Sequence, residues 1–258
     1  MSKHDIFNKL HNKVIKTNLC THCGTCVALS DNIEFTETNF GPKPIRTINS
    51  SIINDSLIYD ACPGKGINYI KLEEKLFDKN QNKDWLIGNY INSYIGYSLN
   101  STIRNKAASG GIITALLVDL LDSKQIDGAI VVKKNKLKPW IFEPFIAYSK
   151  KEIIECSQSI YQPVPMNTIL EQLNKKDGNF AFVGLPDQVL SIRYLQSSNH
   201  EDAKKIKIII GPYVGTNMYL GSIKSFLRSN GVKDINEIKE LNYRAGEWPG
   251  YLEIITKT

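Results

Sequence analysis

The sequence contains no long apolar run. No stretch approaches the roughly 18 consecutive apolar residues that a bilayer-spanning helix needs, so we expect no membrane span. The first ten residues, Met1–Leu10, also lack the apolar core of a secretory signal peptide. We therefore expect a cytoplasmic protein. In that reducing compartment, cysteines more often bind metal or do redox work than form disulfides.

Several recognisable patterns are also missing. The chain has neither the glycine spacing of a dinucleotide-binding fingerprint nor that of a P-loop, and it shows no internal repeat or low-complexity tract. Although the net charge is +6, the lysines are scattered among acidic residues over most of the length. This distribution indicates a solvated basic surface and no nucleic-acid partner.

The overall composition is ordinary. The 258 residues are 42% hydrophobic and 22% charged, which is typical of a soluble globular protein. This length permits one large domain or a small module followed by a larger one. Cysteine is scarce, however, and four of the five cysteines lie in the first quarter of the chain.

These four cysteines have the spacing of iron–sulfur ligands. Cys20, Cys23 and Cys26 are each separated by two residues, and Cys62 stands directly before a proline. Three thiolates at this interval can surround one 4Fe-4S cluster, and a fourth before proline completes the ligand set from a second loop. Gly24 fits because a tight turn around a cluster favours a residue that adopts positive φ.

The four cysteines have two alternative roles. They could be small buried hydrophobic residues, or they could bind zinc, although zinc sites prefer two separated cysteine pairs. The spacing favours iron–sulfur over both. His22 is expected to face solvent or to donate a hydrogen bond to a sulfur, and Cys156 is interpreted as a buried structural thiol.

The patterns predict two domains. Residues 1–75 form a ferredoxin-like 4Fe-4S module that has too small a core to be stable without its cluster. A connecting helix and a linker around Lys79–Lys83 follow. Residues 93–258 form an α/β domain with a mixed, partly parallel sheet, because short β-branched runs alternate with amphipathic stretches. The expected strands are 129–132, 180–183 and 206–210, and the expected helices are 112–121, 151–157, 166–174, 187–196 and 217–229.

Two turns in the α/β domain are candidate binding loops. In Ser109-Gly110-Gly111, followed by Thr114, a loop becomes a helix, so backbone N–H groups and hydroxyls could bind phosphate. Arg104 and Lys106 could balance the phosphate charge. The simpler interpretation is that Ser109 is only the N-cap of that helix.

The second turn lies at Gly184–Gln188, where a strand ends and a helix begins. Ligands of open α/β sheets gather beyond the carboxyl ends of strands. The simpler interpretation of Asp187 is again a helix cap. Residues 243–251 are predicted to form a turn between two strands, in which Arg244 and Trp248 could pack on a cofactor ring.

Taken in order, the motifs resemble the coenzyme F-420 hydrogenase/dehydrogenase beta-subunit family. The resemblance covers nearly the whole chain. It rests on these segments: Cys20–Cys26, Cys62-Pro63-Gly64, Ser109–Thr114, Ile126-Asp127-Gly128, Gln158-Ser159-Ile160-Tyr161, Gly184–Gln188 and Arg244–Gly250. The resemblance implies an FAD in the α/β domain that exchanges electrons with iron–sulfur clusters. Family substrates include the deazaflavin coenzyme and, in a plant relative, a chlorophyll derivative.

The chain departs from the family pattern at several positions. Asp187 and Val214 stand where the family has cysteines of a second cluster, so a second cluster is not expected. Ile160 replaces a lysine that would contact an anion. The end of the sequence within an apparent strand predicts a truncated chain or a fragment of a longer one. These losses resemble the branch of the family found in bacterial surface-polysaccharide gene sets.

Two hypotheses follow. In the first, the chain is an oxidoreductase in which one cluster exchanges electrons with a flavin or another reducible substrate, other than the deazaflavin itself. Tyr161 and Asp187 would orient that substrate or move a proton, and a ferredoxin or a reductase would supply electrons. In the second, the cluster only stabilises a non-catalytic partner of glycan-assembly enzymes.

Overall fold

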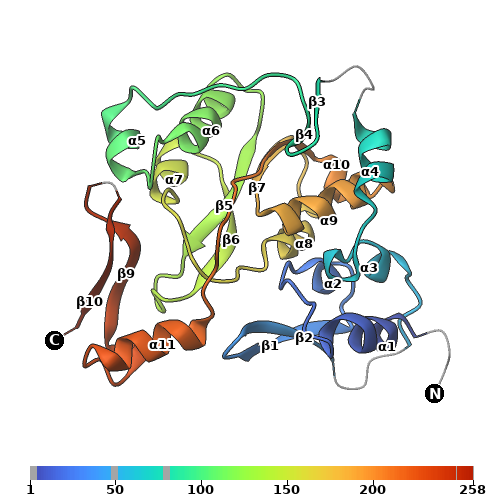
Figure 1. Cartoon of the computed structure of the whole chain (residues 1–258), viewed down its shortest axis with the longest axis horizontal. Coiled ribbons are helices and arrows are strands. Elements are labelled where there is room, and N and C mark those ends of the chain that lie inside the picture. The colour runs from blue at the N-terminus through green and yellow to red at the C-terminus, as the bar shows by residue number, and fades with distance from the viewer. Residues whose placement is uncertain (1–4, 48–51, 78–81, 248, 258) are drawn as a thin grey trace.

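A four-stranded sheet forms the centre of the molecule. The computed structural model describes residues 5–47, 52–77, 82–247 and 249–257 (Figure 1). The sheet has the order β6-β5-β7-β8. Its strands are β5 (Gly128–Lys134), β6 (Phe142–Ala147), β7 (Phe180–Val183) and β8 (Ile206–Ile210). β5, β7 and β8 are parallel, and β6 is an antiparallel edge strand. The prediction of a mixed, partly parallel sheet is therefore confirmed.

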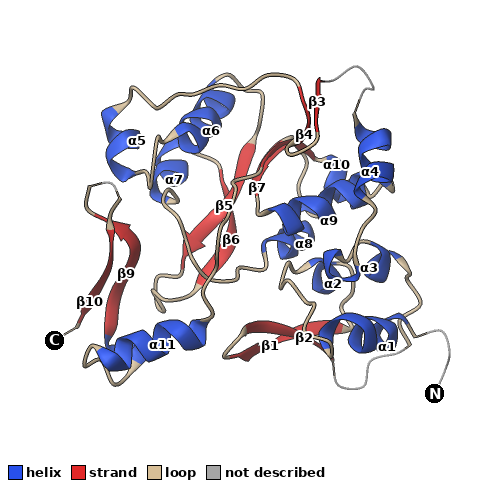
Figure 2. Cartoon of the chain, viewed as in Figure 1, coloured by secondary structure: helices blue, strands red, loops and turns tan. Residues whose placement is uncertain are grey.

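Helices cover both faces of this sheet (Figure 2). Alternate residues of β5 explain why: Ile130 packs toward one core, whereas Ala129 and Val131 pack toward the other. The helices around the first core are α8 (Ile169–Leu173), preceded by the 3₁₀ turn η3 (Met166–Thr168), α9 (Pro186–Ser197) and α10 (Glu201–Lys204). Those around the second core are α5 (Ser101–Lys106), α6 (Ile112–Asp122) and α7 (Lys150–Glu155).

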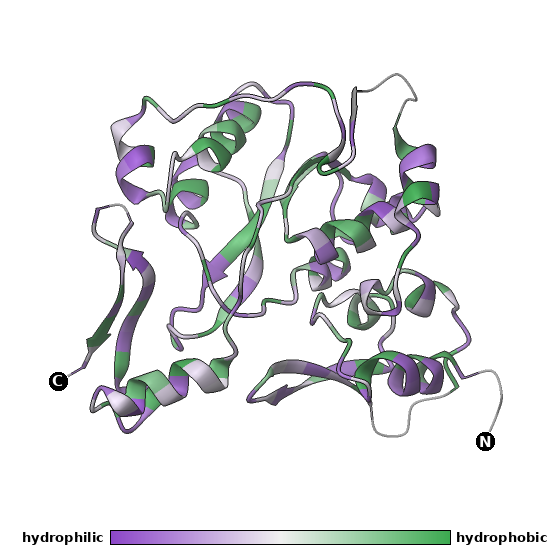
Figure 3. Ribbon diagram, viewed as in Figure 1, coloured by the Kyte–Doolittle hydropathy of each residue, from purple (hydrophilic) through white to green (hydrophobic). Residues whose placement is uncertain are grey.

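Burial on both faces accounts for the continuous apolar runs of the parallel strands. Phe180 and Phe182 are fully buried on the face of α8 and α9, and Ala181 is fully buried on the face of α6. Figure 3 shows the hydrophobic residues gathered in the central strands and in α6. Because both faces are largely covered, these strands carry no regular polar alternation, and their short length distinguishes them from helices.

The segment before residue 77 has a core of its own. This core gathers Phe7, Leu10, Val14 and Ile58 around Cys26. The elements of this segment are α1 (Ile6–Leu10), the π-helical turn η1 (His11–Ile15), α2 (Thr25–Ala28), the hairpin of β1 (Ile33–Thr38) and β2 (Gly41–Arg46), α3 (Leu57–Asp60), η2 (Pro63–Lys65) and α4 (Tyr69–Leu76). The ferredoxin-like character of this module and its boundary at residue 75 stay predictions.

The remaining described elements are two hairpins, a 3₁₀ turn and a helix whose Ile223 and Leu227 belong to the first core. They are β3 (Asn82–Asp84) with β4 (Gly88–Tyr90), α11 (Leu220–Ser229), η4 (Ile235–Glu237), and β9 (Ile238–Ala245) with β10 (Tyr251–Thr256). The predicted turn between two strands is confirmed at β9 and β10. Part of the predicted linker at 79–83, and Trp248, lie outside the described residues. None of the described helices is both long enough and apolar enough to cross a bilayer.

One loop residue adopts an unfavourable backbone conformation. Gln158, between α7 and η3, has φ of +94°, a region that favours glycine. We predict that Gln158→Gly raises the free energy of unfolding by up to about 1 kcal/mol. The relief of about 1–2 kcal/mol of strain exceeds the extra entropy of glycine in the unfolded chain.

Urea unfolding of the two proteins measures this difference. Ser159→Gly is the matched control, because Ser159 has no positive φ, and glycine there lowers stability by about 0.5–1 kcal/mol. A Gln158→Gly variant that is less stable than the parent would contradict the prediction.

Candidate functional site

Two loops bring the four cysteines of the motif together. Cys20 and Cys23 lie in the loop that leads into α2, Cys26 lies in α2 itself, and Cys62 precedes η2. The loops touch at Gly64, where an added Cβ would stand 2.3 Å from the carbonyl oxygen of Leu19. Only glycine permits this approach, so the Cys-Pro-Gly sequence holds the fourth cysteine beside the first.

The pKa values of the four thiols are all raised, and burial is the largest cause. It raises the pKa of Cys23 to about 12, and repulsion from Cys62 adds to the rise. The pKa of Cys26 lies well above its ordinary value because of burial and then repulsion by the other three cysteines. The thiols are therefore close enough to repel one another as thiolates, and a positively charged group among them would be stabilised.

This grouping does not preform a site for a single ion. Among the residues that the structure describes, no three His, Cys, Asp or Glu side chains form a group that could hold a metal ion. The imidazole Nδ1 of His22 lies 2.8 Å from the carbonyl oxygen of Pro42, while the backbone N–H of His22 donates a hydrogen bond to the Cys20 thiol.

Asp187 lies beside the cysteines. It is in the first turn of α9, whose N-cap position is Leu185, and its carboxyl accepts hydrogen bonds from the backbone N–H groups of Asp187 and Gln188. Asp187 therefore helps to cap the helix from inside its first turn. Burial raises the pKa of its carboxyl, while a hydrogen bond with Thr21 opposes the rise. Its charge also contributes to the raised pKa values of Cys20 and Cys23. Asp187 thus acts on the group of four sulfurs rather than on the cavity described next.

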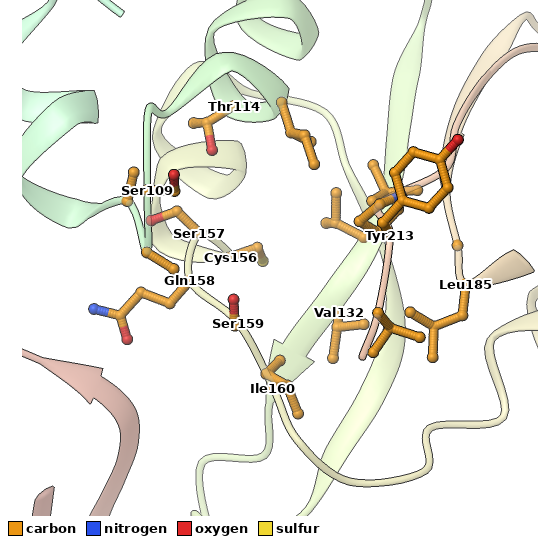
Figure 4. Close-up of a pocket in the computed structure, with 18 of the residues that line it drawn as sticks. Ser109, Thr114, Val132, Cys156, Ser157, Gln158, Ser159, Ile160, Leu185 and Tyr213 are labelled. Carbon is orange, nitrogen blue, oxygen red and sulfur yellow. The ribbon is translucent and has the colours of Figure 1, made fainter. Parts of the chain in front are cut away.

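A cavity of about 690 Å³ lies at the start of α9, where Leu185 and Gln188 line it (Figure 4). It forms where the segments after β7 and β8 approach the loop before α6. Its wall comes from five segments and from single core residues: 107–114, 131–132, 156–162, 183–185 and 212–216, with Gly96, Leu117, Ile153, Val164, Met166 and Gln188. None of the described residues that line it is charged.

The two walls of the cavity differ in chemistry. Hydroxyls line one side, from Ser109, Thr114, Ser157 and Ser159, whereas aliphatic side chains line the other, where Val132 and Leu185 lie (Figure 4). The site therefore suits a flat ligand that has one polar edge and one apolar edge.

The structure separates the predicted cofactor-binding residues into two groups. Ser109, Gly110, Gly111 and Thr114 line the cavity, and Gly111 rather than Ser109 is the N-cap of α6. The interpretation of Ser109 as the N-cap is therefore wrong.

Arg104 and Lys106 are not among the residues that line this cavity. Arg104 donates to the carbonyl oxygen of Ser109 at 2.7 Å and stacks on Tyr97. Lys106 borders a smaller neighbouring cavity of about 190 Å³. Arg104 thus stabilises the Ser109-Gly110-Gly111 loop through a backbone contact and does not line the cavity itself.

Arg244 makes contacts that the sequence did not predict. Its guanidinium donates to the Tyr161 hydroxyl at 3.0 Å and to the carbonyl oxygen of Ala108 at 2.9 Å. It therefore joins the loop before α6 to Tyr161, which lines the cavity. Cys156 packs against the second core, as expected of a structural thiol, but it is only partly buried and also lines the cavity.

Gly64 offers a test of the contact between the cysteine loops. Gly64→Ala is expected to lower the free energy of unfolding by about 1–3 kcal/mol, because the added methyl group meets backbone and Val14. Gly215→Ala is the control: no atom lies within 4 Å of its added Cβ, so its stability is expected to stay within about 0.5 kcal/mol. Equal stabilities of the two variants in urea would contradict this contact.

Two sequence models of one protein family match the chain. The model of the coenzyme F420 hydrogenase/dehydrogenase beta-subunit N-terminal domain matches residues 93–171, and that of the C-terminal domain matches residues 177–258. Both lie after the cysteine loops.

Individual proteins are also similar. The coenzyme F420-dependent sulfite reductase of Methanocaldococcus jannaschii is 23% identical over 92% of this chain and 37% of its own length. The coenzyme F420 hydrogenase subunit beta of Methanosarcina barkeri is 26% identical over 66% of this chain and 60% of its own length. The chain thus spans less than two thirds of either relative.

A solved structure has a similar fold. It is a chain of the F420-reducing [NiFe] hydrogenase complex from Methanosarcina barkeri, with a TM-score of 0.51. The match covers 63% of this chain and 60% of the other at 22% identity, which supports the α/β fold alone.

Proposed function

Because the chain belongs to the coenzyme F420 hydrogenase/dehydrogenase beta-subunit family, we propose that it is an electron-transferring oxidoreductase subunit. It would carry one 4Fe-4S cluster on Cys20, Cys23, Cys26 and Cys62 and a flavin, FAD, in the cavity beside α6. The observation that carries this proposal is the convergence of four cysteine side chains from two loops, close enough that they would repel one another as thiolates.

The donor set fits an iron–sulfur cluster. Four soft thiolates are the usual ligands of such a cluster, and their mutual repulsion would be offset by its iron. A single zinc ion would need ligands about 2.3 Å away. Zinc sites prefer two separated cysteine pairs, whereas three of the cysteines here follow one another at intervals of two residues, and this spacing favours the cluster. When bound, the cluster would supply one-electron transfer.

The cavity fits the flavin. Its volume of about 690 Å³ lies in the range of small-molecule sites. The hydroxyl wall can bond to the polar edge of an isoalloxazine ring, and Val132 and Leu185 can pack on its apolar edge. Backbone N–H groups at the start of α6 can receive phosphate without a charged side chain. A flavin exchanges electrons singly or in pairs, so it can couple a cluster to a two-electron substrate.

A single buried layer separates the two sites. The backbone N–H of Asn167 donates to the carbonyl oxygen of Cys23 at 2.9 Å, and its side chain donates to the carbonyl oxygen of Gln188 at 3.2 Å. Gln188 and Met166, which stand next to this bridge, line the cavity. This proximity supports electron exchange between the two sites.

Tyr161 is our candidate for orienting the substrate. Its hydroxyl accepts a hydrogen bond from Arg244 and keeps its own hydrogen to donate within the cavity. Asp187 is not among the cavity-lining residues; we assign it instead an electrostatic role beside the cysteines. The uncharged wall and Ile160 favour a substrate other than the anionic deazaflavin coenzyme.

A protein partner is part of the proposal. The Methanosarcina barkeri relative is a hydrogenase subunit, and the solved structure is that of a complex. We propose a redox protein as the donor or acceptor of electrons. A purely structural cluster is the second candidate, favoured by the place of Cys26 in the small core of the first module.

Metal analysis tests the cluster. We predict that the full chain, reconstituted without air with iron and sulfide, binds about four irons and four sulfides and turns brown. Cys26→Ser is expected to lose most of this iron, whereas Cys156→Ser, outside the ligand set, is expected to keep it. Zinc in a colourless protein, or iron retained by Cys26→Ser, would refute the assignment.

Flavin uptake tests the cavity. Val132→Phe is expected to weaken FAD binding at least tenfold, because its ring enters the space that Val132 lines. Leu137→Phe is the control, since Leu137 is 89% exposed and lies outside the cavity. Fluorescence quenching of FAD measures both affinities, and iron content checks that each variant is folded.

The same titration separates the two candidate functions. A brown parent protein that takes up no FAD would favour the structural cluster. Equal FAD affinity of the parent and Val132→Phe would place the flavin elsewhere.

A further inference from the structure

A buried hydroxyl network adjoins one of the cysteines. Thr25 opens α2, two residues after Cys23, and is 1% exposed. Its Oγ1 lies 3.4 Å from the Cys23 Sγ and 2.6 Å from the Ser191 Oγ, and it accepts a hydrogen bond from the Asn167 Nδ2 at 2.9 Å. Three polar groups thus compete around a single hydroxyl.

The orientation of the Asn167 amide is fixed by its second contact. Its Nδ2 also donates to the carbonyl oxygen of Gln188 at 3.2 Å, and a carbonyl oxygen can only accept. A flipped amide would place two acceptor oxygens against each other. Asn167 therefore donates to Thr25, and the Thr25 hydrogen is free for another acceptor.

The hydroxyl hydrogen of Ser191 already has an acceptor other than Thr25. The Ser191 hydroxyl donates to the carbonyl oxygen of Ala61 at 2.8 Å, in the residue before Cys62. The single Thr25 hydrogen can therefore go only to the Ser191 Oγ or to the Cys23 Sγ. A neutral thiol is a weak acceptor, whereas a thiolate that ligates a cluster is a strong one. Cluster binding would thus turn the hydrogen toward sulfur.

We propose that Thr25 is a positioning residue that donates its hydroxyl hydrogen to the Cys23 sulfur of the bound cluster and thereby raises the cluster's reduction potential. The inference rests on the proposed function. A hydrogen bond to sulfur stabilises the reduced, more negative cluster more than the oxidised one. Asn167 and Ser191 hold the hydroxyl so that it can make this bond.

The test compares two substitutions of Thr25 in the full chain, reconstituted without air. Thr25→Val keeps the shape and removes the hydroxyl, whereas Thr25→Ser keeps the hydroxyl. We expect both to bind the same iron and sulfide as the parent. In a redox titration followed by electron paramagnetic resonance, the midpoint potential of Thr25→Val is expected to be lower than that of the parent, and that of Thr25→Ser to return close to it.

Ser191→Ala separates hydrogen donation from a merely structural role. It disturbs the same network and removes the competing acceptor, but it leaves the Thr25 donor in place. Its potential is therefore not expected to fall below that of the parent. If it falls as far as that of Thr25→Val, the network acts only through packing, and the proposal is overturned.

Two further outcomes are decisive. An unchanged potential in Thr25→Val with full iron and sulfide would overturn the role of Thr25 and leave the proposed function intact. A parent protein that binds no iron and sulfide would overturn the proposed function and this inference with it. If Thr25→Val fails to fold, Thr25→Ala also lacks the hydroxyl, and the same lower potential is expected of it.

Discussion

The convergence of four cysteine side chains, of which Cys23 and Cys26 are buried, is the constraint on which the first part of the chain depends. Burial alone disfavours each thiolate, and the neighbouring sulfurs add to that cost. The fold nevertheless holds them together, through the contact of Gly64 with the Leu19 carbonyl and the packing of Cys26 in the first core. Such an arrangement is stable as thiols, and it favours any cationic centre that can replace four protons.

The first turn of helix α9 lies between the cysteine group and the larger cavity. Successive residues of a helix point about 100° apart. Asp187 therefore faces the cysteines, while Gln188, one position later, is buried against the bridge to Asn167 and lines the cavity. The turn after β7 thus contributes residues to both sites.

The features that could be predicted from the sequence are those that a short stretch of residues determines. β5, β7 and β8 were predicted because short β-branched runs favour buried strands. The Ser109–Thr114 loop was predicted from its two glycines. The edge strand β6 was missed because Pro144 interrupts it, which only an edge strand tolerates. The bond between Arg244 and Tyr161 joins residues 83 positions apart, and no local pattern encodes such a contact. Arg104 and Lys106 were predicted to bind phosphate because they precede the Ser109–Thr114 loop in the sequence. In the structure, both belong to α5 and neither lines the larger cavity.

The uncharged lining of the larger cavity has a consequence for how ligands are captured. Dissolved salt screens attraction between charges over about 8 Å at physiological ionic strength. With no ionised group in the described wall, there is little Coulombic attraction to screen. Affinity in this cavity would depend on shape and dipoles, and would stay nearly constant from dilute buffer to the crowded ionic medium of a cell.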